Sequence, residues 1–552
     1  MKKKYVRWTL WTIASPFILF IILCILIYLP PIQNFLVDKA AVYASEATGM
    51  NISVGRISLS FPLNLVVTNV DAASPHNDTL LSVRRLQVNV QLLPLLKKQV
   101  EVDGISLQGA TVNSNDLIHG MKLNGTLGEL FISSHGVALD PETAIVNKVL
   151  LKDTDLSLCL NDTAAADTAA SDTAYWKIIL QDIDLQNVSF ALDMPLDSLS
   201  LAASLDNAIL RDGLIDLHKS AYSLQTFRIE NGRVRYDNGK PLAADSLSSG
   251  LDPSHIALTD IGVKLDSLCY GGRNMKAIIS QFVLKERSGV EIVSATGRMV
   301  SNDKVLRVPS LKLETRDSYL ELNAAMDWNA LDFKDEGLVS ARLMADIGKP
   351  DVVRFMGSMD EKFIRQYPSE PLRIRTGIDG DLNKLKLTTL TAELPGALGL
   401  FARGELTHLT DSLLRGGDIT LEAETKDLKF VSTLAEGIEI PYGTRLEGKF
   451  TMAGTKMGTD LLLMQPEAQA VVAADTIPIT VYNDSISVAD DFKMERAARL
   501  FAKYDLSRDR YEADLAVNHF DLHQFMPADS LYTLSTRLKV EGEGFDFFSP
   551  RT

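Results

Sequence analysis

The sequence predicts a mainly β protein that begins with a membrane-spanning helix and contains a few short helices. Three observations lead to this prediction: an uncharged run near the N-terminus, long stretches in which apolar and polar residues alternate, and Gly, Asn and Asp residues between those stretches. The 552 residues, of which 46% are hydrophobic and 23% charged, suffice for roughly three or four domains or one long repetitive body.

The N-terminal residues predict a single membrane anchor. Residues 1–7 form a basic tail, and residues 8–29 then run for 22 positions without a charge, which as a helix of about 33 Å would cross a hydrocarbon core of about 30 Å. The positive-inside rule places the tail in the cytoplasm and the rest of the chain on the other side. The anchor residues are Trp8, Trp11, Phe17, Phe20, Leu23 and Tyr28. A cleaved signal peptide is the alternative, but its apolar segment is usually about 7–15 residues, and no small-residue cleavage site follows this run.

Residues 30–49 predict an amphipathic linker helix that begins after the anchor. Pro31 suits a first helical turn, apolar residues recur at helical spacing, and Gly49 is a favourable stop. From Ile52 the apolar period changes to two, and this alternation continues along residues 50–552, which we predict to be a repetitive β region. A change of parity after Gly104 indicates a β-bulge.

Three local segments within the β region have their own predictions. Asn231-Gly232 is a strong two-residue hairpin signal and would pair Ile229 with Val234. Residues 161–174 are small, polar and low in complexity, which is typical of a loose loop. Residues 350–367 show helical spacing and predict a helix that packs against the sheet or covers a groove.

Composition excludes several classes of function. The formal charge is −15, from 56 basic and 71 acidic residues, so the chain lacks the basic surplus expected of a nucleic-acid-binding protein. Cys24, Cys159 and Cys269 are the three cysteines, too few for a disulfide scaffold or a four-thiolate zinc site. A disulfide between Cys159 and Cys269 remains open, because sequence spacing gives no measure of their distance.

Three partial motifs do not amount to a site. Residues 443–449 approach a phosphate-binding loop, but Phe450 stands where Ser or Thr is required, and the flanking residues alternate as a strand. Residues 379–384 resemble the start of a calcium loop without its Gly and Glu. His519 and His523 have zinc-ligand spacing, but the surrounding residues read as strand. We therefore predict no catalytic residue, no metal site and no cofactor, and a protein that is not an enzyme.

Several segments resemble the TamB and AsmA-like family of inner-membrane-anchored envelope proteins. The similarity is strongest in PPIQNFLVDKAAVYASEATGMNISVGRISLSFPLNLVVTNV (residues 30–70) and LQVNVQLLPLLKKQVEVDGISLQGATVN (residues 86–113), with weaker likeness at residues 520–527 and 542–550. The resemblance carries no catalytic motif. It implies a long, antiparallel-rich sheet curved into a U-shaped, taco-like groove with an apolar interior.

The resemblance also implies a function, a location and partners. Family members are linked to phospholipid transport between the two membranes of a diderm envelope, or to outer-membrane protein assembly. A single-pass inner-membrane anchor would leave most of the chain in the periplasm. We expect phospholipid in the groove and no nucleic acid. Relatives usually continue into a C-terminal region that engages an outer-membrane β-barrel assembly partner, so we expect the full-length protein to continue beyond residue 552. The residues expected to line the groove are Val88, Val90, Leu92, Ile105, Leu107, Phe227, Ile229, Val234, Tyr236, Leu320 and Leu322.

Two alternatives stay open at the level of sequence. A period of two also describes a series of closed β-sandwiches, in which a second sheet covers each apolar face. An assembly scaffold that pairs exposed strand edges with client proteins would likewise need no catalytic residue.

Overall fold

The prediction of a mainly β chain is confirmed by a computed structural model, in which 71% of the described residues lie in strands and the 25 strands belong to one large sheet. The structure describes residues 39, 41–42, 45, 49–60, 64–74, 79–90, 102–114, 120–139, 142–161, 176–239, 250–334, 337–356, 361–434, 437–466 and 496–544. The predicted anchor at residues 8–29 lies outside these ranges, as do nearly all of the linker helix at 30–49 and all but Asn161 of the loop at 161–174. None of the described helices is long and apolar enough to span a membrane.

The chain divides into two compact units, which are described one at a time. Unit 1 comprises Met1–Leu242, Asp252–Gly272 and Ile279–Arg287, and unit 2 comprises the remainder. β12 (Asn274–Glu286) contributes residues to both.

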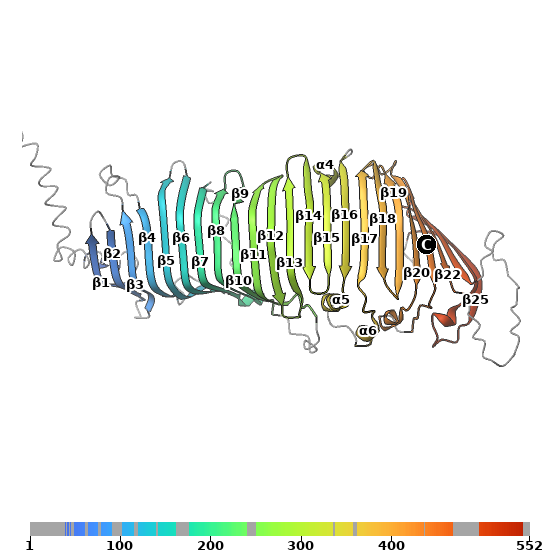
Figure 1. The fold of residues 1–552 in the computed structure, drawn as a ribbon, viewed down its shortest axis with the longest axis horizontal. Helices are drawn as coiled ribbons and strands as arrows, with labels where there is room; N and C mark the ends of the chain where they lie inside the picture. The colour runs from blue at the N-terminus through green and yellow to red at the C-terminus, as the bar shows by residue number, and fades with distance from the viewer. Residues whose placement is uncertain are drawn as a thin grey trace, which may run out of the picture. The chain divides into compact units, whose positions relative to one another are not determined.

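Unit 1 consists almost entirely of strands (Figure 1). Its elements are β1 (Asn51–Ser60), β2 (Asn64–Ala73), β3 (Thr79–Val90), β4 (Val102–Asn113), β5 (Met121–Leu139), β6 (Glu142–Leu160), β7 (Lys177–Met194), the 3₁₀ turn η1 (Pro195–Asp197), β8 (Leu199–Asp216), β9 (Ala221–Leu224), β10 (Thr226–Asp237) and β11 (His255–Gly271).

Successive strands of unit 1 pair with their sequence neighbours from β1 to β8. β8 then pairs with β9 and β10, and both of these pair with β11. Of these ladders between described strands, β6–β7 is parallel and the others are antiparallel. A parallel pair needs a crossover connection, and the chain between Leu160 and Lys177 provides its length.

The Asn231-Gly232 hairpin prediction is wrong. Residues 226–237 form the single strand β10, which pairs with β8 on one side and β11 on the other. Asn231 has a left-handed φ of 53°, as a hairpin turn would require, but here the left-handed residue bends a continuous strand. Ile229 and Val234 therefore lie on one strand and do not pair with each other. The bulge predicted after Gly104 lies directly before it: Asn89 pairs with Gly104 and Val90 with Val102, which leaves Asp103 of β4 as the extra residue.

Unit 2 continues the strand pattern but adds helical segments at the ends of its strands (Figure 1). Its elements are β13 (Glu291–Ser301), β14 (Val305–Thr315), β15 (Tyr319–Asp327), α4 (Trp328–Leu331), β16 (Leu338–Ile347), α5 (Lys349–Phe355), α6 (Glu361–Gln366), β17 (Leu372–Asp381), β18 (Lys384–Leu394), β19 (Leu398–Thr407), β20 (Gly416–Thr425), η2 (Lys429–Thr433), β21 (Arg445–Ala453), β22 (Lys456–Met464), β23 (Ala497–Asp505), β24 (Arg510–Asp521), η3 (Leu522–Gln524) and β25 (Thr533–Glu543). Each consecutive pair from β13 to β25 is antiparallel.

The segment predicted as one helix over residues 350–367 contains α5 and α6, with residues 357–360 between them outside the description. α6 packs on η2 through an aromatic cluster, in which the rings of Phe363, Tyr367 and Phe430 lie 5.1–5.6 Å apart between centroids. Leu394, Ala397 and Leu428 complete this buried cluster. α6, η2 and the turn between β18 and β19 therefore form a small core at one end of the unit 2 strands.

This cluster predicts where unit 2 is most sensitive to truncation. Phe363 is 2% exposed, so Phe363→Ala should leave a cavity and lower the free energy of unfolding by about 3–5 kcal/mol. Phe333→Ala is the matched control, because Phe333 is 74% exposed and its loss should change stability by less than about 0.5 kcal/mol. Denaturant unfolding followed by tryptophan fluorescence measures both, and equal effects would contradict this assignment of the core.

Arg499 on β23 and Asp460 on β22 form a two-pronged ion pair across neighbouring strands, with N–O distances of 2.8 and 2.7 Å. The hydrogen bonds from Arg499 lower the pKa of Asp460 below its ordinary value, although burial acts in the opposite direction. Because the carboxyl pKa is lower in the folded than in the unfolded state, the pair stabilises the fold above the unfolded pKa of about 4, and this contribution is lost as the pH falls through the folded pKa.

The ion pair therefore predicts a pH-dependent mutational effect. Asp460→Asn should destabilise unit 2 at pH 7, and the difference from the unsubstituted protein should shrink as the pH is lowered below about 4. Urea unfolding at several pH values checks this expectation. A difference that stays constant down to pH 3 would mean that the charge on Asp460 contributes nothing.

Candidate functional site

The strand register of unit 1 arranges apolar residues, most of them aliphatic, into rows that cross the sheet from strand to strand. The first row contains Leu59, Leu65, Val88, Ile105, Ile132, Val149, Ile183, Leu210, Phe227 and Leu265, one from each paired strand. The second row contains Ile57, Val67, Leu86, Leu107, Leu130, Leu151, Leu185, Ala208, Ile229 and Val263. Because the two rows are two residues apart on each strand, they share one face of the sheet.

On each of the strands that these rows cross, the regular alternation of apolar and polar residues is interrupted next to the second row. Past this interruption, the apolar positions continue in further rows. One contains Val54, Val70, Val83, Ala110, Leu127, Thr154, Val188 and Leu205. Another contains Ile52, Ala72, Leu81, Val112, Gly125, Leu156, Phe190, Ala203, Val234 and Leu258. A shorter row contains Leu123, Leu158, Leu192, Leu201, Tyr236 and Ile256.

The interruption occurs at the same level on nine strands of unit 1, β1 to β8 and β10, and we call it the kink column. Its members are Gly55, Asn69, Arg84, Gly109, Gly128, Asp153, Asn187, Asp206 and Asn231, which the flanking register pairs place opposite one another. Five of the nine members adopt left-handed backbone, with φ between 49° and 62° at Asn69, Gly109, Asp153, Asn187 and Asn231. One extra residue per strand reverses the alternation, so the apolar positions on both sides of the column remain on one face.

Side chains of the kink column bond to one another along the sheet. Asn187 Nδ2 donates to Asp153 Oδ1 at 2.9 Å, and Asn231 Nδ2 donates to Asp206. A side chain on Gly128 would collide with Asp153, since an added Cβ would lie 2.8 Å from the Asp153 Cβ. Asn, Asp and Gly are the residues that tolerate left-handed backbone at least cost, which explains why this column is polar within an otherwise apolar face.

Burial distinguishes the apolar face of unit 1 from a closed core. Nearly all side chains of the rows are partly buried, and Ile105 and Phe190 reach 36% and 39% exposure. The fully buried members are small or lie beside the kink column, such as Val83 at 5% and Ala208 at 4%. The three buried hydrophobic clusters found among the described residues all belong to unit 2. Within the described part of unit 1, therefore, the rows have no second apolar layer packed on them.

The predicted lining residues distribute over these rows. Val88, Ile105 and Phe227 lie in the first row, Leu107 and Ile229 in the second, and Val234 and Tyr236 in the rows beyond the kink column. Val90 lies at the end of β3 opposite Val102, and Leu92 falls outside the described residues.

Leu320 and Leu322 belong to unit 2, where the register forms similar rows. The row through Leu322 contains Leu311, Leu322, Leu343, Thr376, Leu390, Ala402, Leu421, Gly448, Leu461, Leu500, Leu515 and Leu538. The row through Leu320 lies two residues away on the same face of β15. Both units therefore carry apolar rows.

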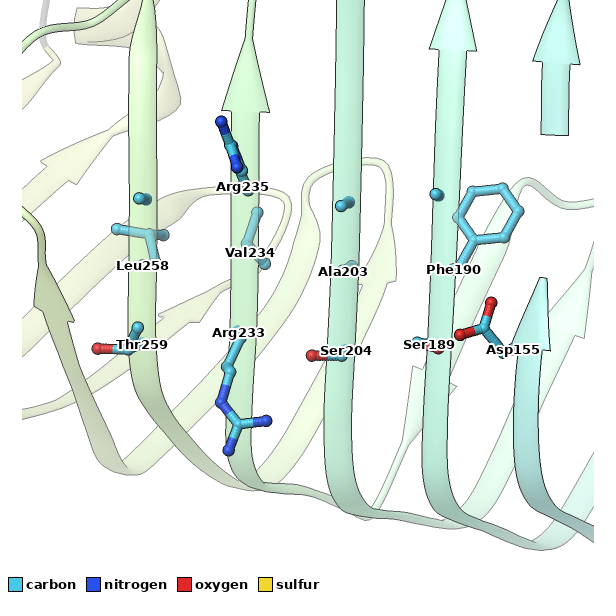
Figure 2. A pocket seen from close by; sticks show the side chains of 13 residues that line it. Asp155, Ser189, Phe190, Ala203, Ser204, Arg233, Val234, Arg235, Leu258 and Thr259 are labelled. Atoms are coloured by element: carbon cyan, nitrogen blue, oxygen red, sulfur yellow. The ribbon is translucent and has the colours of Figure 1, made fainter. Parts of the chain in front are cut away.

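Unit 1 also has an open hollow of about 390 Å³, shown in Figure 2. β7, β8 and β11 contribute mostly Ala, Ser and Thr side chains together with Phe190 and Leu258, and β10 contributes Arg233, Val234 and Arg235. Figure 2 shows the two arginines extending in opposite directions along β10. Asp155 is its one carboxylate, and no His or Cys lines it. The hollow therefore lacks the adjacent acid and base that proton transfer would require.

The other chemistry-bearing residues are likewise dispersed. No group of three or more His, Cys, Asp or Glu residues in the described part of the chain could hold a metal ion. Cys159 and Cys269 are unpaired, and the Cys159 thiol donates to Asn161 Oδ1 at 3.3 Å. His519 lies on β24 and His523 on η3. Residues 445–453, which include most of the partial phosphate-binding motif at 443–449, form the strand β21, as their alternation predicts.

Comparison with known proteins adds no functional assignment: neither the known protein families nor the curated proteins contain a match to this chain.

Sequence reasoning missed the kink column, although the sequence carries a signal for it. In six four-residue segments, Asn, Asp or Gly stands directly before the residue at which the apolar alternation reverses. These segments are VTNV (67–70), LQGA (107–110), LKDT (151–154), LQNV (185–188), IENG (229–232) and LTDI (258–261). In the sequence alone, each segment indicates only a separate turn or bulge. The pairing of the strands shows that these positions lie opposite one another. The Asn231-Gly232 prediction failed for the same reason.

The left-handed backbone of the column gives a direct test. Asn231→Gly should leave the stability of unit 1 nearly unchanged, whereas Asn231→Val should cost about 1–2 kcal/mol, because a β-branched residue is strained at positive φ. Denaturant unfolding of the two variants measures the difference. Equal stability of the glycine and valine variants would show that this position is not held in the left-handed conformation.

Proposed function

We propose that this protein is an inner-membrane-anchored conduit whose apolar sheet face carries the acyl chains of phospholipid between the inner and outer membranes of a diderm envelope. The observation that carries the proposal is the set of aliphatic rows in unit 1, which cross ten paired strands and remain partly exposed. The resemblance of residues 30–70 and 86–113 to TamB and AsmA-like proteins agrees with it.

The energetics of lipid desorption explain why such rows would be useful. Moving an acyl chain into water is opposed by about 0.8 kcal/mol per CH₂, or about 13 kcal/mol for a 16-carbon chain. A continuous apolar face replaces the water around the chain, while the polar headgroup stays hydrated. Aliphatic side chains at each strand spacing of about 4.8 Å give neighbouring positions of similar chemistry, so no single position needs to hold the lipid tightly.

A curved, U-shaped sheet belongs to this proposal. The kink column crosses nine strands of unit 1 at one level, and a bend there would let the sheet wrap around a lipid, with the rows inside and charged residues outside. The predicted anchor at residues 8–29 would hold the chain at the inner membrane with residues 1–7 in the cytoplasm. The proposal needs no metal, cofactor or catalytic residue, because the lipid is moved without chemical change.

Two adjacent leucines provide a matched test of the lipid-facing side. Leu151 lies in the second row, whereas Leu150 precedes it on β6 and points to the opposite face. A photo-crosslinking amino acid at position 151 should capture phospholipid in cells, and the same group at position 150 should capture at least about tenfold less. Mass spectrometry of the crosslinked protein identifies the adduct. Equal capture at both positions, or capture at position 150 alone, would reject the rows as the lipid-binding face.

A scaffold for outer-membrane protein assembly is the second candidate function. β25 supports it, because β25 pairs only with β24 among the described strands and nearly all its side chains are exposed. An extended client segment could add to the free edge of β25 by backbone hydrogen bonds. In that case crosslinkers on β25 would capture polypeptide, and Leu151→Asp would leave envelope function intact. Capture of lipid at position 151 together with loss of function in Leu151→Asp favours the conduit.

A further inference from the structure

Two connections at one end of the unit 2 strands present large apolar side chains to solvent. Phe333, in the connection between β15 and β16, is 74% exposed, and Leu413 and Leu414, between β19 and β20, are 76% and 64% exposed. Ala330 of α4 and Leu382 belong to one buried cluster, against which Leu409 of the second connection also packs. The three exposed side chains, which we call the rim tips, are therefore braced by the same core.

The backbone at Phe333 is unusual for such a residue. Phe333 has a φ of 54°, and it is the only large apolar residue among the described non-glycine residues with positive φ. Its N–H donates to Ala330 O at 3.1 Å and the N–H of Lys334 donates to Asn329 O at 2.7 Å, so it occupies the helix-ending position that usually belongs to glycine. An aromatic side chain that is both exposed and held in left-handed backbone indicates a role outside the fold.

Hydrogen bonds close the turn that carries Leu413 and Leu414. The carboxylate of Asp411 accepts the N–H groups of Leu413 and Leu414 at 2.8 and 3.2 Å. Arg415 Nε donates to the carbonyl of Gly454 at 2.8 Å, and the Gly454 N–H donates to Arg415 O at 2.6 Å, which ties this connection to the β21–β22 turn. Both leucines are thus held outward by a turn that its hydrogen bonds close.

A basic residue directly follows the apolar tip in each of the two connections. Lys334 directly follows Phe333, and Arg415 directly follows Leu414. The carboxylate of Asp332 is paired with Arg273 at 2.9 Å and with Lys334 at 3.3 Å. A cation next to an apolar tip suits the boundary between phosphate headgroups and acyl chains, where apolar side chains enter the hydrocarbon and basic side chains reach the headgroups.

We propose that Phe333, Leu413 and Leu414 insert into the surface of a phospholipid bilayer. The tips are convex and come from two separate connections, which a fluid lipid surface accommodates without a matching groove. A stable interface with a second protein buries about 800 Å² per partner, more than three protruding side chains offer. Such a contact needs little affinity of its own if the predicted anchor already holds the chain near a membrane, because tethering raises the effective concentration. The proposal is independent of whether the rows of unit 1 carry lipid.

Lipid-quenched fluorescence tests the insertion directly. The full chain, with Cys24, Cys159 and Cys269 replaced by Ser, receives one new cysteine labelled with an environment-sensitive dye at position 333 or 414. The matched control is position 196 in unit 1, because Leu196 is 62% exposed and Leu414 is 64% exposed. Vesicles of phosphatidylethanolamine and phosphatidylglycerol with brominated acyl chains should quench the dye at positions 333 and 414 and leave it unchanged at 196. Absence of quenching at the rim tips, or equal quenching at position 196, overturns the proposal.

Substitution of the tips provides the second measurement. Combining Phe333→Ser, Leu413→Ser and Leu414→Ser should weaken association of the full chain with separate vesicles by at least about tenfold, whereas Leu196→Ser should not. The lipid that co-purifies with the chain should be unchanged, which separates this result from a test of the conduit. If the triple variant instead converts a dimer into a monomer in sedimentation, the tips contact a second copy and the proposal is wrong.

A glycine variant separates membrane contact from a structural role. Glycine adopts the backbone of residue 333 without strain, so Phe333→Gly should keep or raise the melting temperature and still reduce vesicle association. A fall in melting temperature would assign Phe333 to the fold and overturn its role at the membrane.

Discussion

Backbone hydrogen bonding in register is the constraint on which the rest of this structure depends. A strand presents its side chains alternately to two faces, so a slip of one residue would move every apolar side chain to the other face. In unit 1 the register holds across ten paired strands, which brings aliphatic residues from Leu59 to Leu265 into one row. The kink column preserves this order because the nine strands that it crosses reverse their alternation at the same level. A single strand without its extra residue would interrupt the rows on one side of the column.

The two units bury their apolar residues differently. Unit 2 gathers aromatic and aliphatic side chains from α6, η2 and the β18–β19 turn into a buried cluster, and unit 1 leaves its rows partly exposed. A sheet of half-buried aliphatic side chains gains less from the hydrophobic effect than a closed core of the same composition. The ladder hydrogen bonds and cross-strand aliphatic contacts must therefore supply more of the stability in unit 1. The same arrangement leaves apolar surface available to a ligand, which is why the conduit proposal rests on unit 1.

Much of the fold follows from local sequence signals, and the failures share one cause. Alternation of apolar residues predicted strands such as β3, β4, β15 and β21, because a period of two is a property of each strand by itself. The same alternation placed Val88, Ile105, Phe227 and Leu107 on apolar faces. Asn231-Gly232 was misassigned because left-handed backbone serves equally in a hairpin turn and in a kinked strand. Only the neighbouring strands β8 and β11, which pair along both sides of β10, decide between these two uses. The parallel β6–β7 pair and the aromatic cluster around Phe363 were also beyond local signals, since both join segments separated by connections of variable length.

The sequence by itself determined that the chain is rich in half-apolar strands, that its composition lacks a basic surplus or a cysteine scaffold, and that no recognised catalytic motif is complete. These properties are local or compositional, so a linear chain carries them in full. The tertiary structure alone decided which strands are neighbours, how Asn69, Asp153, Asn187 and Asn231 align into one column, and that the rows of unit 1 lack a described covering layer. The physical reason is that exposure and alignment depend on hydrogen-bonded neighbours distant in sequence, and alternation specifies that a strand has an apolar face without specifying what lies against it.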